Sequence, residues 1–337
     1  MSRSTLASRV LARGLRPFAK VEAGEAVTAF TMMFAAFLLL SAYYLLKTVR
    51  EPLILLHGGA EVKLYARAGQ AVLMVGVVHV YGEIAKRVGR QKLLGIVFAF
   101  FISNLVLFAV LARAHVDIGL AFFLWVGLFS YTSVAQLWAL AADIYSEEQG
   151  KRLFPILGIG SSVGAVAGSR LAKALVPFGP EALMGAAVVL LILCTGILAW
   201  VESRSGAAGR AREESVREEP LSSENALHLL LRDRYLLLIA GMIILLNWCN
   251  SAGEYVFDRA ILAAVHTAQA DGQTPEAFVG SIKADYFAWY NGLGMLLQLF
   301  AVSRILTKLG VRNALLFLPV FALFGYAGAV AAFLAAP

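Results

Sequence analysis

Apolar runs of about 20 residues recur along this chain, and they limit its fold more than any other feature of the sequence. The run at 182–201 carries no charged residue. A helix of about 20 apolar residues crosses a hydrocarbon core of roughly 30 Å, and no run alternates with the period of two that barrel strands require. Charged residues make up 15% of the chain, against about 25% in soluble domains. We therefore expect an all-α integral membrane protein.

Hydropathy over windows of about 19 residues predicts about nine transmembrane helices. They run approximately over 26–48, 64–85, 93–113, 118–141, 153–177, 182–201, 235–257, 283–306 and 313–335. Basic residues gather before the first helix and in alternate loops, which predicts a cytoplasmic N-terminus by the positive-inside rule. The abundance of Ala, Gly and Arg indicates a bacterium, and hence the inner membrane.

A polar segment divides the predicted helices into two groups. Residues 203–233 carry charges of both signs and Pro220, so this segment reads as a cytoplasmic linker. We expect an N-terminal bundle of six helices over 1–202 and a partial C-terminal bundle of three over 234–337. A weak internal repeat, which aligns TVREPLI at 48–54 with VFDRAIL at 256–262, supports the two-lobed plan of a transporter.

Ionisable residues inside apolar runs are costly, and they are the first candidates for a binding site. The first helix carries Lys47, Arg50 and Glu51, and the seventh carries Glu254 and Asp258. Facing each other across the two bundles, these groups would bind substrate and, through Asp258, form an outer gate. The alternatives are a Lys47–Glu51 pair with Arg50 extending outward, and a static ion pair at the rim.

Other polar residues in the predicted spans are weaker candidates. Arg67, Gln136 and Asn291 are expected to line a cavity, although most intramembrane amides only bond neighbouring helices. A second set of residues surrounds the predicted inner turns and is expected to form a cytoplasmic gate, with a solvated loop of mixed charge as the alternative. This set comprises Gly82, Arg87, Gly89, Arg90, Asp143, Lys151 and Arg152.

Two motifs resemble known transporters. The turn GEIAKRVGRQK at 82–92 resembles the G-x-x-x-D-R-x-G-R-R signature of the major facilitator superfamily, with Lys86 in place of Asp. The segments YYLLKTVREPLIL (43–55) and QGKRLFPILGIG (149–160) resemble the ATP:ADP antiporters, a family with twelve helices. The resemblance implies a substrate contact at Arg50, where those exchangers carry Lys. It also implies that this chain lacks their last three helices, and Val126 stands near their acidic contact in helix 4.

The chain shows no metal-ligand cluster, no nucleophile–base pair and no phosphate-binding loop, so we expect neither an enzyme nor a cofactor. The leading hypothesis is a secondary transporter of major-facilitator type with a truncated second lobe. It would exchange an anionic nucleotide or phosphorylated metabolite, with ATP and ADP as the implied solutes, and would not bind nucleic acid. The alternatives are a proton-coupled carrier of another solute, and a truncated module that transports nothing or needs a partner chain for the missing helices.

Overall fold

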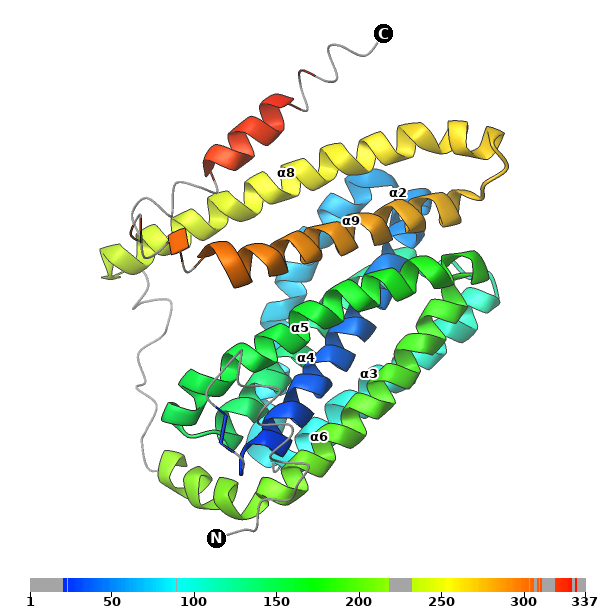
Figure 1. The fold of residues 1–337 in the computed structure, drawn as a ribbon. Helices are drawn as coiled ribbons and strands as arrows, with labels where there is room; N and C mark the ends of the chain where they lie inside the picture. Colours follow the sequence, from blue (N-terminus) through cyan, green and yellow to red (C-terminus); the bar gives the residue numbers. More distant parts are fainter. Residues whose placement is uncertain are drawn as a thin grey trace.

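A computed structural model describes residues 21–22, 24–88, 90–217, 232–302, 304–305, 308, 310, 319–328 and 331 (Figure 1). All regular structure in these residues is helical, which confirms the predicted all-α class. The elements are α2 (Ala26–Arg87), α3 (Arg90–Arg113), α4 (Gly119–Ile144), α5 (Glu147–Leu175), the 3-10 turn η1 (Val176–Phe178), α6 (Pro180–Arg217), α8 (Arg234–Ala270), α9 (Pro275–Leu297), the π-helical turn η2 (Gln298–Val302) and the short helix Pro319–Gly328.

The helix α2 consists of two arms joined at a single residue. Gly59 has φ 74° and ψ 179°, a conformation that is almost restricted to glycine, and it lies between helical residues on both sides. We call 26–58 the first arm and 60–87 the second arm. The predicted loop between 48 and 64 is therefore wrong. The charged residues of this segment favoured a solvent-exposed loop, but most of them are buried and form ion pairs. The backbone therefore stays helical up to the bend.

Five helices in the described part of the chain are long and apolar enough to cross a membrane, and the first of them, at Ala26–Ile84, is 59 residues long. At about 1.5 Å per residue, each arm of α2 is long enough to cross by itself. The helices α5 and α9 reach 29 and 23 residues, but charged and small polar residues lower their hydropathy. The total of nine spans stays a prediction, because much of 313–335 lies outside the described residues.

Several helices extend beyond the predicted spans. The helix α6 continues to Arg217, so the expected linker begins as a helix, and 218–231 lie outside the described residues. The helix α8 continues to Ala270 instead of ending near 257, and α9 begins at Pro275 instead of 283. Hydropathy locates only the apolar centre of a helix, whereas the hydrogen-bonded backbone continues into polar sequence.

The first arm of α2 is the centre of the packing. It contacts α4, α5 and α6, while α9 packs along α5 and beside α8 (Figure 1). Three glycines of α5, Gly160, Gly164 and Gly168, lie directly against backbone atoms of this arm, at Met33, Phe37 and Ser41. The Ser41 hydroxyl donates a hydrogen bond of 3.1 Å to the Gly164 carbonyl. This close approach fixes the arm that carries the charged residues Lys47, Arg50 and Glu51.

Candidate functional site: a buried ion cluster

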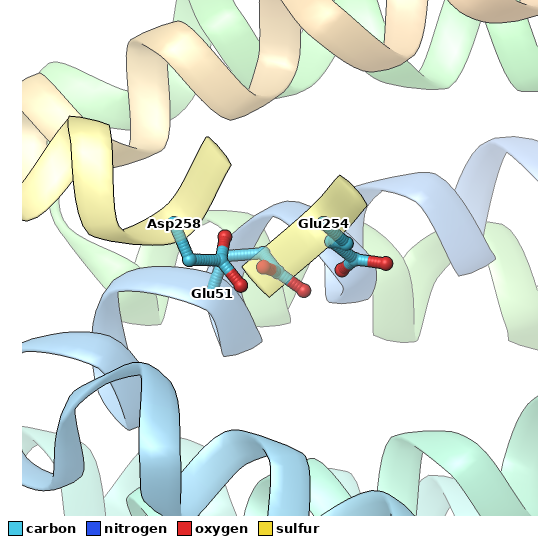
Figure 2. Close-up of side chains that lie close together, drawn as sticks. All are labelled: Glu51, Glu254 and Asp258. Atoms are coloured by element: carbon cyan, nitrogen blue, oxygen red, sulfur yellow. The ribbon is translucent and has the colours of Figure 1, made fainter. Parts of the chain in front are cut away.

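Three carboxylates from two helices converge near the bend of α2. Glu51 comes from the first arm, and Glu254 and Asp258 lie one turn apart on α8 (Figure 2). One oxygen of each lies within 4.8 Å of the others. Three negative charges at this spacing repel one another strongly, so the arrangement requires a cation between them.

The side chain of Lys63, from the second arm, supplies that cation. Its Nζ donates to Glu51 Oε2 at 2.5 Å, to Asp258 Oδ2 at 2.7 Å and to Glu254 Oε1 at 2.8 Å. An ammonium group has three N–H donors, and here each one meets a different carboxylate. The Lys63 ammonium therefore occupies the position in which a bound cation would contact all three acids. The bend at Gly59 makes this contact possible, since it turns the second arm back toward Glu51.

Three further cations surround the acids. Lys283 of α9 lies 3.2 Å from Glu51 Oε2 and also pairs with Asp258 Oδ1. The Nε of Arg50 donates to Glu51 Oε1 at 3.2 Å, and its guanidinium lies 4.6 Å from the Phe123 ring centroid on α4. Arg67 of the second arm pairs with Glu254 Oε2. We call these residues, with Lys47, the ion cluster: Lys47, Arg50, Glu51, Lys63, Arg67, Glu254, Asp258 and Lys283.

Lys47 differs from the other cations of the cluster. Its Nζ lies 4.4 Å from the ring centroid of Phe287 and 5.2 Å from that of Tyr44. No ion pair within 4.0 Å joins Lys47 to any of the described carboxylates. The alternative Lys47–Glu51 pair is wrong, because other cations occupy Glu51. Arg50 does not extend outward either, since it is only 7% exposed.

The cluster carries an excess of positive charge in an apolar setting. Its five basic and three acidic side chains give a net charge of +2 when all are ionised. Buried apolar residues, among them Ile54, Leu55 and Ile261, cover its side toward the bend. Charges at such depth are retained at a high cost in desolvation, which is typical of functional sites. Chemically, the arrangement suits the binding of an anion with several negative charges.

Of two residues that were predicted to line a cavity, one lies beside the ion cluster and the other lies away from it. Asn291 lies beside the cluster, where its Oδ1 accepts a hydrogen bond of 2.9 Å from the Tyr44 hydroxyl. Gln136 of α4 instead donates to the Tyr81 hydroxyl on the second arm. Tyr81 is 14 residues beyond Arg67 in the sequence, or about 21 Å along a helix. The Gln136 contact holds α4 to the second arm and does not belong to the cluster.

Two of the residues predicted to form a cytoplasmic gate, Lys151 and Arg152, make ion pairs with residues outside the predicted set, and the gate itself stays a prediction. Lys151 pairs with Glu147 on its own helix at 2.7 Å, and Arg152 pairs with Glu25 at 3.2 Å. Gly82 and Asp143 are partly buried, on α2 and α4. Gly89 and the side chains of Arg87 and Arg90 lie outside the described residues. Asp258, predicted as a gate residue at the outer rim, is only 2% exposed and lies within the cluster.

Sequence reasoning missed the two most buried lysines, Lys63 and Lys283. Both stand just before an apolar run, where a lysine is normally read as a loop residue at the membrane surface. They are 2% and 0% exposed, respectively. Charge balance gave no signal for them, since Lys47, Arg50 and Arg67 already matched the acids of the cluster in number.

The fold and the cluster together define an integral membrane protein with a buried, cationic site between helices. The family model described as TLC ATP/ADP transporter matches residues 11–117, roughly a third of the chain. The matched segment contains both arms of α2 and the helix α3, so it includes the cluster residues Lys47, Arg50, Glu51, Lys63 and Arg67. The resemblance to the ATP:ADP antiporters is confirmed over that segment. No curated protein and no solved structure matches the chain.

Proposed function

We propose that this protein is a secondary transporter that exchanges an anionic nucleotide, or a related phosphorylated metabolite, across the membrane. The observation that carries the proposal is the buried ion cluster with its net positive charge, most of whose basic residues lie in the segment that matches the ATP/ADP transporter family. ATP and ADP are the substrates to test first.

The cationic side chains suit phosphate groups. A guanidinium presents two parallel N–H donors to a phosphate, and a lysine supplies a compact charge. Lys47 has only aromatic rings around its ammonium in the described structure, so its charge is available to a ligand. The helix α4 offers the Phe123 ring beneath Arg50 in place of an acidic contact. None of the acidic residues of the cluster comes from α4, which leaves the choice among phosphorylated solutes open.

The position of the cluster suits alternating access. Its members come from α2 on one side and from α8 and α9 on the other, which are the helices expected to belong to the two lobes. If the lobes rock about a central site, the ion pairs between α2 and α8 must break when the lobes separate. Binding of an anion would compete for the lysines and so favour that separation.

The test is counter-exchange in liposomes that contain the full chain and are preloaded with ADP. We expect uptake of labelled ATP that requires internal ADP and falls at least about tenfold in Arg50→Ala, which removes a charge-assisted contact. Arg113→Ala, which removes an exposed arginine at the end of α3, is the matched control and should leave uptake unchanged.

Other outcomes would point elsewhere. Uptake that follows a pH gradient and ignores internal ADP would favour a proton-coupled carrier with Glu51, Glu254 or Asp258 as the titrating group. The absence of any exchange by folded protein would contradict the proposal and favour a module that transports nothing by itself.

A further inference from the structure

We propose that Lys63 and Lys283 bind the phosphate oxygens of the substrate, and that the carboxylates of the cluster occupy these lysines when no substrate is bound. The proposal rests on the exchange function above and assigns the residues that receive the anion. Binding is then an exchange of ligands on two buried ammonium groups, in which phosphate oxygens replace carboxylate oxygens.

The first support is the use of the ammonium donors. Lys63 directs its three donors to three different carboxylates, so it has no donor left for a substrate unless a carboxylate leaves. Lys283 contacts only Glu51 and Asp258, and its Nζ lies 4.9 Å from the Phe257 ring centroid. One donor of Lys283 is thus without a carboxylate partner, and we infer that an entering anion first meets Lys283 and Lys47.

The second support is the charge of the two kinds of ligand. A phosphoryl group carries about two negative charges and three acceptor oxygens. It can therefore replace two carboxylates on the lysines without leaving either ammonium group unpaired in an apolar setting. A neutral solute, or one with a single charge, would leave part of that buried charge uncompensated. This selects substrates with a terminal phosphate.

The third support is the set of partners that each carboxylate keeps after it leaves the lysines. Glu51 still has Arg50, and Glu254 still has Arg67. Asp258 is only 2% exposed, and its two ion pairs in the described structure are to Lys63 and Lys283. Asp258 is therefore the strongest competitor of the substrate, because it depends entirely on the two lysines that the substrate needs.

The inference predicts that substitutions of a lysine and of an aspartate in the cluster change the KM for ADP in opposite directions. Lys283→Met removes an anion-binding group, so the KM for ADP should rise at least about tenfold. Asp258→Asn removes the competitor, so the KM for ADP should fall, while kcat is unchanged or lower because the ion pairs that close the site are weaker. Lys283→Arg, which keeps the charge, should retain most of the affinity of the wild-type protein.

The experiment measures KM and kcat of ADP-driven exchange in the full chain for these three variants, with Arg113→Met and Glu276→Gln as controls at exposed residues of α3 and α9. A purely structural role would predict that the lysine and aspartate variants both lose folded protein and leave KM unchanged in what remains. An unchanged KM in Lys283→Met, or a raised KM in Asp258→Asn, would overturn the inference while leaving the exchange function intact.

A second measurement separates the inference from the function. Inorganic pyrophosphate, added to purified protein, should raise the Tm of the wild type and of Asp258→Asn, but not that of Lys283→Met. This result would support the anion site even if no nucleotide were exchanged. A rise of the same size in Lys283→Met would overturn the assignment of this lysine.

Discussion

Two lysines of the ion cluster, Lys47 and Lys63, make opposite contributions to the stability of the fold. Lys63 holds three buried carboxylates together, so its charge stabilises the fold as well as the site. Lys47 lies among aromatic rings, at 4.4 Å from the Phe287 centroid, and contributes a partly buried charge without a close carboxylate. A cation over aromatic faces is stabilised only modestly, so the partial burial of Lys47 is a cost to the fold that a bound anion would relieve.

We predict that Lys47→Met separates binding from stability. Methionine fills a similar volume and removes the partly buried charge, so the Tm of the purified protein should be unchanged or higher. ATP uptake should fall at least about tenfold, since an anion contact is lost. Paired measurements of Tm and uptake on one preparation check this. A clear fall in Tm would mean that Lys47 has a structural partner and is not held for a ligand.

Lys63→Met, in contrast to Lys47→Met, should lower the stability of the protein. It leaves Glu51, Glu254 and Asp258 close together without their central cation, and breaking a buried pair from one side costs about 3–5 kcal/mol. We expect a large fall in Tm, measured by thermal unfolding in detergent. A Tm equal to that of the wild type would show that the carboxylates do not depend on Lys63.

Residue-level prediction from the sequence named six of the eight residues of the ion cluster. Arg50, Glu51, Glu254 and Asp258 were found because charge inside an apolar run is visible without any structure. Lys63 and Lys283 were missed because the bend at Gly59 and the early start of α9 bring residues from the ends of apolar runs into the interior. Hydropathy windows cannot show that a residue at the end of a run is turned inward.

At the scale of the elements, Gly59 determines whether the cluster can form. The two arms of α2 meet there at φ 74°, and residues Lys63 and Arg67 follow within two turns. A non-glycine residue in this conformation costs on the order of 1–3 kcal/mol. The helices themselves were predictable from apolar runs, whereas this bend was not, since the pair Gly58-Gly59 at the end of an apolar run resembles an ordinary loop.

We predict that Gly59→Ala lowers both Tm and ATP uptake, because relaxation of the strain would move the second arm away from Glu51. Gly69→Ala is the matched control, since Gly69 lies in the second arm with open space around its Cα. That change should be neutral or slightly stabilising, as alanine favours a helix by about 1 kcal/mol. Equal effects of the two substitutions would contradict the role assigned to the bend.

The glycines of α5 allow a second test at this scale. A methyl group at Gly164 would lie 2.8 Å from Phe37 Cα, so the first arm of α2 would have to shift. Gly164→Ala should therefore destabilise the protein by about 1–3 kcal/mol. Gly158→Ala, where nothing lies within 4 Å of the added methyl, should not. Thermal unfolding of the two variants tests this prediction. A Gly164→Ala protein as stable as the wild type would show that α5 and α2 are not tightly packed.

At the scale of the whole molecule, ion pairs join helices that are expected to belong to different lobes. Besides the cluster, Arg170 and Lys173 of α5 pair with Asp285 of α9, the first at 3.1 Å. Arg259 of α8 pairs with Glu61 of α2 at 3.1 Å. These pairs are partly exposed, so each contributes little to stability by itself. Their common feature is that separation of the lobes would break them all.

We predict that a reversible link between α5 and α9 stops transport. Cysteines at positions 170 and 285, in a protein whose Cys194 and Cys249 are replaced by alanine, can be joined by a short bifunctional thiosulfonate reagent. Uptake should stop on cross-linking and return on reduction, because α5 and α9 could no longer separate. The same treatment of Ala263→Cys and Thr267→Cys, two exposed positions one turn apart on α8, should have no effect. Transport by the fully linked 170–285 protein would show that these helices do not separate during the cycle.

The central claim is that the buried ion cluster binds the phosphates of a nucleotide. The most direct measurement compares the rise in Tm that ADP and adenosine give to the purified wild-type protein and to Lys47→Met. A ligand at about 100 times its Kd stabilises the protein by about 2.7 kcal/mol. The account predicts a clear rise with ADP, little with adenosine, and a loss of the ADP effect in Lys47→Met. Equal rises with ADP and adenosine, or an ADP effect that survives in Lys47→Met, would contradict it.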